Sequence, residues 1–187
     1  MFVIPKVIVT EDQWILKGME KFAESGVEGL VIERMSSELG CSKSSFYWYF
    51  KNRDEYIARL VQRWSDITTQ QVIRHSSGSE TAEEQLRTML SQMFSATQKG
   101  DFLFYLRRLS KEYPSFQAML EKIELTRMKY AQELFMKLGM APEMAEQKSH
   151  ILYHYYLGWY ERHKHDQIEV EHLNRHIEML QEQLLGI

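Results

Sequence analysis

The sequence predicts an all-α protein of about nine helices, and three observations support this fold class. Apolar residues recur every three or four positions along most of the chain, and no segment alternates with period two for long enough to form a strand. Glycine and proline fall mainly between these segments, for example at Gly26, Gly40, Gly139 and Pro142, where helices are expected to end or begin. The 187 residues, 44% of them hydrophobic, are enough for one core or for a small domain joined to a larger one.

The helices can be placed in order from their boundary signals. The first begins at the capping box Thr10–Gln13, with Val9 and Trp14 placed for a hydrophobic staple, and it ends at Gly26. The other predicted helices follow at about 31–39, 42–50, 52–74, 86–94, 102–112, 115–138, 142–163 and 167–185. The clearest loop between them is HSSGS at 75–79.

Composition favours an ordinary soluble protein. The formal net charge is −3, so the chain as a whole has no basic character that would mark a nucleic-acid-binding protein. The single cysteine, Cys41, excludes an internal disulfide and favours a reducing compartment. The apolar start MFVIPKVIVTED lacks the features of a signal peptide, and no apolar run approaches the roughly 18–20 residues of a membrane span. We therefore expect a cytoplasmic protein with no membrane partner.

One stretch, CSKSSFYWYFKNRDEY, joins five consecutive rings to hydroxyl and basic side chains. It begins at Cys41, directly after Gly40, so two short helices meet at a tight turn in the manner of a helix-turn-helix. In such a motif the second helix enters the major groove of DNA. Phe46 and Phe50 are four residues apart and can pack inward together.

The other side of this second helix suits DNA. The window 39–53 contains three basic residues and no acidic one. Hydroxyl, phenol and ammonium groups all hydrogen-bond phosphate, and several of them can reach base edges. The side chains predicted to face outward here are Lys43, Ser44, Ser45, Trp48 and Tyr49.

The run ERMSSELGCSKSSFYWYFKNRDEY resembles the signature of TetR-type transcriptional regulators, which is roughly AxxxGVSxGxLYxHFxxKxxL. The first helix, WILKGMEKFAESG, is similar to the family's first helix, which ends in a similar Phe-Ala-Glu-x-Gly run. The resemblance covers about 10–56, and the rest of the chain matches in length, helical content and a C-terminal helix pair. The matching positions are Gly40, Ser42, Phe46 in place of Leu, Tyr47, Tyr49 in place of His, Phe50, Arg53 in place of Lys and Tyr56 in place of Leu.

This resemblance implies a homodimeric transcriptional regulator, a repressor that an unknown small-molecule effector releases from a near-palindromic operator in double-stranded DNA. Residues 1–55 would form the helix-turn-helix DNA-binding domain, and residues 56–187 the helical effector-binding and dimerisation domain. No cofactor is implied. Carried over by position, Tyr47, Lys51 and Arg53 would contact phosphates, and Lys43, Ser44, Ser45, Trp48 and Tyr49 would line the groove.

The sequence departs from the family pattern at the start of the second helix. The family usually has threonines where Leu30 and Val31 stand, and these cap the helix and touch phosphate. Neither residue here can do so, and the missing cap is expected to cost roughly 0.5–2 kcal/mol unless another group replaces it. Glu33 follows in the same helix, where an acid would oppose DNA if it pointed there.

The rest of the chain offers candidates for an effector pocket and a dimer interface, each weighed against an ordinary core. Aromatic segments at 102–113 and 153–160 suit pocket walls between helices. Gly158 lies within an aromatic helix, where close approach of another helix would justify it. The effector-pocket candidates are Trp64, Phe94, Phe104, Tyr105, Met128 and Tyr153. The dimer-interface candidates are Tyr156, Gly158, Trp159, Leu173, Ile177 and Leu180.

Two other classes of function are disfavoured. Histidine pairs at i, i+4 spacing, at 150/154 and 172/176 with His163 and His165 between them, could hold zinc on a helix face, but no cysteine or carboxylate completes the set. No nucleophile–base pair, phosphate loop or carboxylate pair stands out, so we expect no enzyme. Two alternatives remain: a ligand-binding helical bundle whose helix-turn-helix no longer reads DNA, and a DNA-binding protein that acts through a protein partner without an effector.

Overall fold

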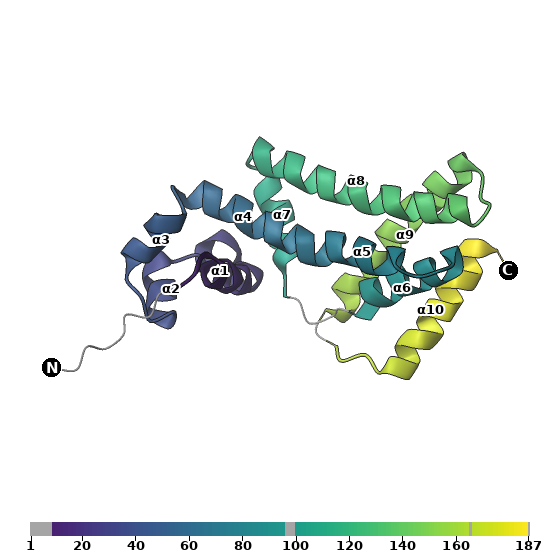
Figure 1. The fold of residues 1–187 in the computed structure, drawn as a ribbon, viewed down its shortest axis with the longest axis horizontal. Coiled ribbons are helices and arrows are strands. Elements are labelled where there is room, and N and C mark those ends of the chain that lie inside the picture. Colours follow the sequence, from purple (N-terminus) through teal and green to yellow (C-terminus); the bar gives the residue numbers. More distant parts are fainter. Residues whose placement is uncertain (1–8, 96–99, 165, 187) are drawn as a thin grey trace. The chain divides into compact units, whose positions relative to one another are not determined.

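The computed structural model describes residues 9–95, 100–164 and 166–186, and every regular element within them is helical (Figure 1). The all-α prediction is therefore confirmed. The elements, including one 3-10 turn (η1) and one π-helical turn (η2), are α1 (Glu11–Ser25), η1 (Gly26–Gly29), α2 (Ile32–Glu38), α3 (Lys43–Tyr49), α4 (Arg53–Ser65), η2 (Asp66–Gln70), α5 (Gln71–Ser77), α6 (Ala82–Ser95), α7 (Phe102–Ser110), α8 (Pro114–Lys137), α9 (Pro142–His163) and α10 (Val170–Leu185).

The run of α4, η2 and α5 corresponds to the single long helix that the sequence predicts at about 52–74. The three elements follow one another without a gap, so the described residues contain nine separate α-helical segments, as predicted. The run ends at Ser77, beyond the predicted end at Arg74. Ser76 is buried there, and its hydroxyl oxygen lies 2.7 Å from that of Tyr130, so this turn packs against α8 instead of opening the predicted loop.

The chain is divided into two compact units. Unit 1 comprises the chain up to Trp64 together with Gly100–Leu120, and unit 2 comprises the remaining residues. Unit 1 therefore contains α1, α2, α3 and α7, whereas unit 2 contains α5, α6, α9 and α10. The functional division that the sequence suggests, 1–55 and 56–187, stays a prediction.

The start of α1 is set by the predicted capping box. The Thr10 hydroxyl accepts a hydrogen bond from the backbone N–H of Gln13 at 3.3 Å, and the Gln13 side-chain oxygen accepts one from the Thr10 N–H at 2.9 Å. Two N–H groups that would otherwise lack partners at the helix start are thereby satisfied. Val9 and Trp14, the predicted staple pair, are both buried.

Aromatic packing joins α1 to α7 in unit 1. The ring of Phe22 lies 4.7 Å from that of Phe102 and 6.2 Å from that of Tyr105, between centroids. Phe102 also stacks on Trp64 at 5.0 Å. Rings from three separate parts of the sequence therefore build one core, which is how α7 becomes part of the N-terminal unit.

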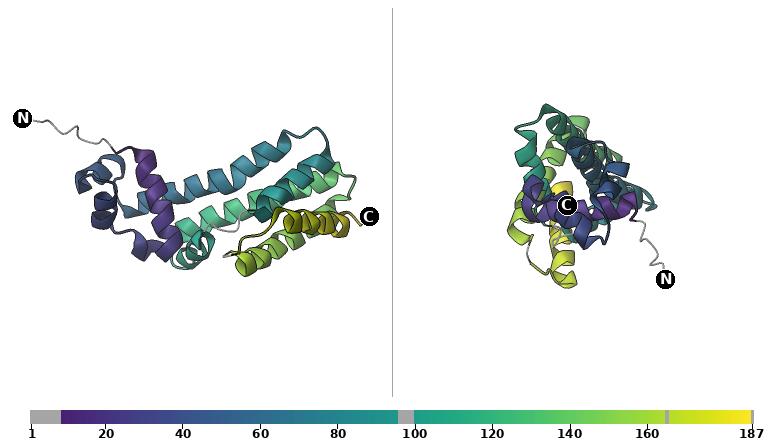
Figure 2. Two further views of the ribbon diagram at one scale, coloured as in Figure 1. Left: turned by 90° about the horizontal axis from the view of Figure 1, so that it is seen from below. Right: turned by 90° about the vertical axis from the view of Figure 1, so that its left-hand side faces the viewer.

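The helix-turn-helix formed by α2 and α3 lies beside α1 (Figure 2). The turn between them passes through Gly40, whose φ of +68° is a left-handed conformation that L side chains rarely adopt. Met35 on α2 and Phe46 on α3 are buried, as is Phe50 after α3. The predicted motif is thus built as the sequence indicates, with glycine where the turn requires it.

Unit 2 has its own core, in which α6 packs against α5, α9 and α10 (Figure 1). The buried residues of the unit 2 core are Leu86, Met89, Leu90, Phe94, Ala131, Leu134, Phe135, Ala145, Leu152, Ile177, Leu180 and Leu184.

Among the residues that the model describes, no helix is both long enough and apolar enough to cross a membrane.

Candidate functional sites

The inner side of α3 is held by a cluster of buried rings. Phe46 lies edge-on to Trp14 at 5.4 Å and to Tyr56 at 4.9 Å, and Phe50 lies 4.6 Å from Tyr56, all between centroids. These four rings come from α1, α3, α4 and the turn after α3. Because the rings fix one position of α3 and the residue directly after it, they determine which side chains of α3 can face solvent.

The outer side of α3 exposes large aromatic side chains. Trp48 is 83% exposed and Tyr47 is 62% exposed, although both are apolar enough to favour burial. Exposed rings next to one another are typical of an interaction surface. We define the reading surface as the six predicted DNA-binding residues that are exposed on α3 and the residues after it: Lys43, Ser44, Tyr47, Trp48, Lys51 and Arg53.

The other two predicted DNA-binding residues, Ser45 and Tyr49, are half-buried and bonded within unit 1. The Ser45 hydroxyl accepts a hydrogen bond from the indole N–H of Trp14 at 3.2 Å. The Tyr49 hydroxyl donates one to the backbone carbonyl of Val9 at 3.1 Å. Both contacts tie α3 to the start of α1, so these two side chains position the helix.

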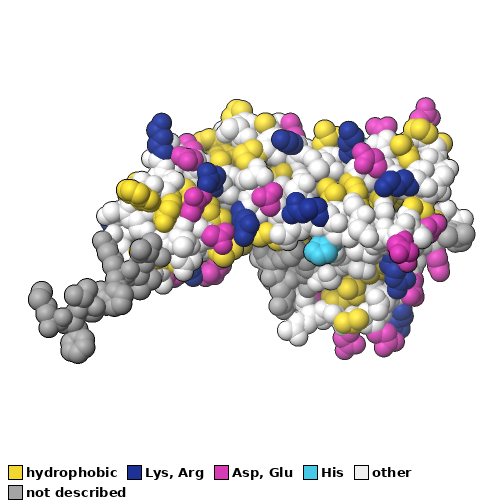
Figure 3. Space-filling model, in the orientation of Figure 1, with side chains coloured by type: hydrophobic (Ala, Val, Ile, Leu, Met, Phe, Trp, Pro, Cys, Tyr) yellow, Lys and Arg dark blue, Asp and Glu magenta, His cyan; other side chains and the backbone are white. Residues whose placement is uncertain are grey.

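Two cations of the reading surface have partners within the unit. The Lys43 ammonium forms an ion pair with the Glu33 carboxylate of α2, and this contact holds the pKa of the Glu33 carboxyl below its ordinary value. The Arg53 guanidinium donates to the backbone carbonyl of Val27. On the face of the molecule seen in Figure 3, basic and acidic side chains are interspersed.

The start of α2 lacks a side-chain cap. Val31 is the N-cap residue, and its side chain makes no capping hydrogen bond. Leu30, just before it, is 2% exposed and packs in the core. The departure seen in the sequence is therefore present in the structure, and no hydroxyl from these two positions is available for phosphate.

The six predicted effector-pocket residues are divided between the two units. In unit 1, Trp64 stacks on Phe102 as described, and the Tyr105 ring lies against Gly26, where a Cβ would come within 2.5 Å of it. Phe104 is exposed. In unit 2, the candidates are Phe94 in the core, Met128, which is half-buried, and Tyr153, which donates to Glu124 at 3.1 Å.

A polar cluster in unit 2 was not anticipated from the sequence. Arg127 on α8 donates from Nε to the Thr69 hydroxyl and from Nη2 to the Thr68 hydroxyl, both at 2.9 Å. The two threonines belong to the π-helical turn η2, an irregularity that is frequent at functional sites. Burial raises the pKa of the Tyr156 hydroxyl, while the nearby Arg127 charge opposes this. A lone arginine in a polar stretch of helix gives no sequence signal of this arrangement.

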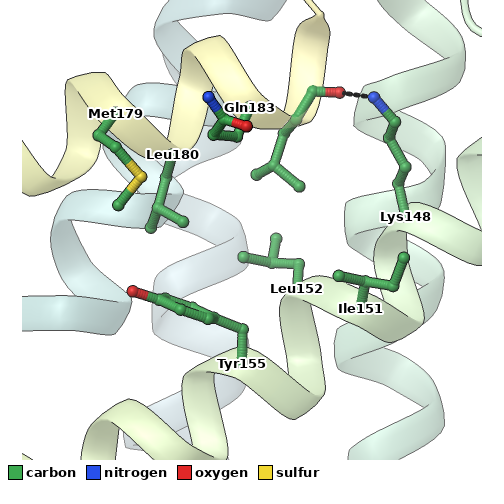
Figure 4. A pocket seen from close by; sticks show the side chains of 8 residues that line it. Lys148, Ile151, Leu152, Tyr155, Met179, Leu180 and Gln183 are labelled. Carbon is green, nitrogen blue, oxygen red and sulfur yellow. Dashed lines mark hydrogen bonds between the residues drawn. The ribbon is translucent and has the colours of Figure 1, made fainter.

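An apolar groove of about 240 Å³ lies between α9 and α10 (Figure 4). Ile151 is 62% exposed, and Tyr155 and Met179 are also exposed, so apolar side chains of both helices face the groove and solvent. The Lys148 ammonium donates to the Leu184 carbonyl at one end. We call this the outer groove, and its lining residues are Lys148, Ile151, Leu152, Tyr155, Met179, Leu180, Gln183 and Leu184.

Most of the predicted dimer-interface residues face the core of unit 2. Ile177 and Leu180 are buried in it, although Leu180 also lines the outer groove. Gly158 is exposed, and a Cβ built on it would meet nothing within 4 Å. The other three, Tyr156, Trp159 and Leu173, are partly buried against the core.

A half-buried histidine lies against rings where α6, α9 and α10 meet. His176 lies 5.3 Å from Phe94, 5.8 Å from Tyr155 and 5.6 Å from Trp159, between ring centroids. Burial lowers the pKa of its imidazole, and the charges of His172 and His163 lower it further. No group of three or more metal-ligating side chains gathers within the described residues, and His165 lies outside them.

Comparisons with known proteins agree with the prediction of a helix-turn-helix protein. No protein-family model matches the sequence, and no curated protein matches it. Solved structures do match. A transcriptional regulator from Rhodococcus sp. Rha1 has a TM-score of 0.76 and 17% identity, covering 95% of this chain and 97% of that one. A TetR-like transcriptional regulator from Rhodococcus sp. RHA1 has a TM-score of 0.72 and 18% identity, covering 100% of both chains.

A third structure is the transcriptional regulator FadR from Bacillus subtilis in complex with stearoyl-CoA. It has a TM-score of 0.68 and 18% identity, covering 95% of this chain and 100% of that one. At sequence identities this low, the comparisons establish only that the arrangement of helices is shared. The shared arrangement extends over nearly the whole length of each chain compared. The resemblance in the helix-turn-helix sequence is therefore matched by the whole structure: this chain has the fold of TetR-family transcriptional regulators.

Proposed function

We propose that the chain is a TetR-type transcriptional regulator that acts in the cytoplasm and binds double-stranded DNA through α3. The observation that carries the proposal is the reading surface, where Trp48 and Tyr47 stand exposed beside basic side chains on the second helix of a helix-turn-helix. A helix of this kind enters the major groove and contacts base edges with its outer side chains. Selection of fragments of the source genome by the purified protein, at low and moderate salt, tests the proposal.

The structure supports different roles for the predicted DNA-binding residues. Lys43, Ser44 and Trp48 are proposed to face base edges, since they lie on the exposed side of α3. Tyr47, Lys51 and Arg53 are proposed to contact phosphates. Ser45 and Tyr49 are proposed to position α3, instead of contacting DNA, through their hydrogen bonds to Trp14 of α1 and to the Val9 carbonyl.

We also propose that two copies of the chain associate through the outer groove. Ile151, Tyr155 and Met179 form an exposed apolar surface on two adjacent helices. In a two-fold dimer the same surface of each copy is buried against the other, so one patch is enough. Gly158, on α9 as well, leaves room beside the helix for a partner's side chain. Two-fold symmetry would let the dimer bind a near-palindromic operator as a repressor.

The effector is proposed to bind in unit 2. Met128 and Tyr153 remain candidates there, and Arg127 with the η2 threonines supplies a cation beside an irregular turn. The Bacillus subtilis neighbour was solved with stearoyl-CoA, which makes acyl-CoA thioesters a reasonable first set of compounds to try here. A ligand that weakens DNA binding by some factor must itself bind more weakly, by the same factor, to the DNA-bound protein than to the free protein. Thermal stabilisation by a compound that also weakens DNA binding is the test.

The alternative is a ligand-binding helical bundle that no longer reads DNA. The uncapped start of α2 and the acid at Glu33 favour it, because they remove one phosphate contact and add a negative charge nearby. The two functions differ in one measurable property. A regulator binds particular DNA sequences with an affinity that falls steeply with salt, whereas the bundle shows no sequence preference.

A further inference from the structure

The ion pair between Glu33 and Lys43 joins α2 to the reading surface. Both side chains are more than half exposed, at 62% and 53%, so the pair lies on the surface that is proposed to meet DNA. Exposed ion pairs contribute little to stability, because water screens the two charges. The ion pair therefore affects what Lys43 can bind more than it affects the stability of unit 1.

Glu33 changes the charge that Lys43 presents. Alone, a lysine ammonium is attracted to the nearest phosphate, whatever the sequence. With the Glu33 carboxylate in contact, the two groups together carry no net charge, and the carboxylate repels a phosphate that approaches. The ammonium has three N–H donors, so hydrogen bonds to a second, uncharged acceptor remain available. Guanine presents two such acceptors in the major groove, O6 and N7.

The other acid near the end of α2 has a different environment. Glu38 lies 3.4 Å from the Lys21 ammonium and 3.5 Å from the Lys17 ammonium of α1, and 3.1 Å from Arg34 on its own helix. The Glu38 carboxylate is therefore neutralised mainly by the two lysines of α1. Glu33 and Glu38 share a helix and a charge, but of the two Glu33 is the one paired with a residue of α3.

We propose that Glu33 determines the DNA-sequence specificity of the protein. By neutralising the charge of Lys43, it prevents this lysine from contacting phosphate, so that Lys43 hydrogen-bonds instead to a base edge with neutral acceptors, such as guanine. The inference rests on the proposed function, because it requires that α3 reads DNA. It also assigns a role to the residue that, in the sequence, counts against DNA binding. Glu33 weakens binding to DNA in general and thereby raises the ratio between operator and other sequences.

The proposal predicts how removal of the Glu33 charge changes binding. In Glu33→Gln, Lys43 becomes an additional phosphate contact, so binding to random-sequence duplex becomes tighter by about threefold or more, and the slope of log K against log salt becomes steeper by about 1. The affinity for the operator changes less, because Lys43 already hydrogen-bonds to a base in that complex. The ratio of operator to random-sequence affinity therefore falls.

The experiment measures both affinities across a salt series with full-length protein. The probes are a random-sequence duplex and the duplex recovered by genomic selection. Glu38→Gln is the matched control, because it removes the same charge from the same helix without touching Lys43, and it should leave the ratio unchanged. In a Lys43→Met background, Glu33→Gln should have no more effect than Glu38→Gln. The pKa of the Glu33 carboxyl, followed by NMR without DNA, should rise in Lys43→Met.

Each outcome bears on a different statement. If wild-type protein selects no DNA sequence, the proposed function fails and this inference falls with it. If wild-type protein is selective and Glu33→Gln shifts both affinities equally, Glu33 acts only through general charge and the inference is overturned. Weaker operator binding by Glu33→Gln also overturns it, because the carboxylate would then be a direct contact. An unchanged Glu33 pKa in Lys43→Met removes the ion pair on which the argument depends.

Discussion

The Tyr56 hydroxyl donates a buried hydrogen bond of 2.6 Å to the backbone carbonyl of Trp14, and so joins α4 to α1 directly beside Gly18. A Cβ on Gly18 would come within 2.7 Å of the Tyr56 ring and 2.8 Å of a Leu60 methyl group. Burial raises the pKa of the Tyr56 hydroxyl above its ordinary value, so the group keeps the proton that it donates. The orientation of α1, on which α3 rests, therefore depends on a glycine in the middle of a helix.

Gly18→Ala should therefore destabilise the protein, although alanine is the better helix former. We expect the free energy of unfolding to fall by about 1–3 kcal/mol, as for other insertions into a packed core. Urea unfolding followed by circular dichroism measures this. Gly158→Ala is the control, measured in the Ile151→Glu background, in which no partner chain is expected beside it. A Cβ there meets nothing within the chain, so replacing this helical glycine should be neutral or stabilising by up to about 1 kcal/mol. Equal effects at the two sites would contradict the packing described.

Trp48→Ala should separate DNA binding from folding. The side chain is 83% exposed, so its loss should change the free energy of unfolding by no more than about 0.5 kcal/mol. Operator affinity should fall at least several-fold, because the ring is the largest group of the reading surface. Electrophoretic mobility shifts with the selected duplex measure this. Phe104→Ala, also an exposed aromatic of unit 1 but on α7, should bind as wild type does.

Lys43→Ala should weaken operator binding by about 1–3 kcal/mol if Lys43 contacts a base, and leave the fold and the dimer intact. Fluorescence anisotropy with the operator and with a duplex changed at the guanine positions would measure it. Lys129→Ala, an exposed lysine on α8, serves as the control for loss of one positive charge. Unchanged operator affinity in Lys43→Ala would show that α3 is placed differently on DNA.

Ile151→Glu should dissociate the proposed dimer. The substitution places a charge in the outer groove, where two copies would bury it without a partner. Analytical ultracentrifugation should show a monomer at concentrations at which the wild type is dimeric. Val170→Glu is the control, because Val170 is equally apolar and exposed on α10 but does not line the groove. A dimer that survives Ile151→Glu would place the contact on another surface.

Stability should fall as the pH drops below about 6.5, and His176 should account for part of the loss. Its folded-state pKa is lowered by burial, so the unfolded state binds the proton more readily. Above this pH the imidazole is neutral in both states and makes no difference. Below it the unfolded state gains a proton first and unfolding becomes easier, until the pH passes the folded-state pKa as well.

Chemical unfolding of His176→Gln between pH 8 and 5 measures this contribution. The variant should lose less stability than wild type over the acid part of the range. His150→Gln, at an exposed position on α9, should follow the wild-type curve. A His176→Gln curve parallel to that of wild type would show that His176 does not have the lowered pKa described.

Much of the fold was predictable because its signals are local. The capping box at Thr10 and Gln13 lies within four residues, and the tight turn at Gly40 depends on the conformation of one residue. Helical periodicity separated nine segments correctly. The extension of α5 was not predictable, because Ser76 is kept helical by burial and by a 2.7 Å contact with the Tyr130 hydroxyl, 54 residues away.

The candidate sites were less predictable because they depend on which side of a helix meets its neighbours. Ser45 and Tyr49 differ from Ser44 and Trp48 by one position each, and only the place of α1 beside α3 makes the first pair bond inward. The periodicity of α10 marks Ile177 as apolar but does not say whether it meets its own core or a second chain. Such distinctions need the tertiary structure.

The measurement that tests the central claim most directly is the selection of genomic DNA fragments by the purified protein at two salt concentrations, with the Trp48→Ala variant in parallel. If α3 reads DNA, wild-type protein recovers one near-palindromic site at both concentrations, and Trp48→Ala recovers little of it. Recovery of no particular sequence by wild-type protein, even at low salt, would contradict the account and leave the ligand-binding bundle as the better description.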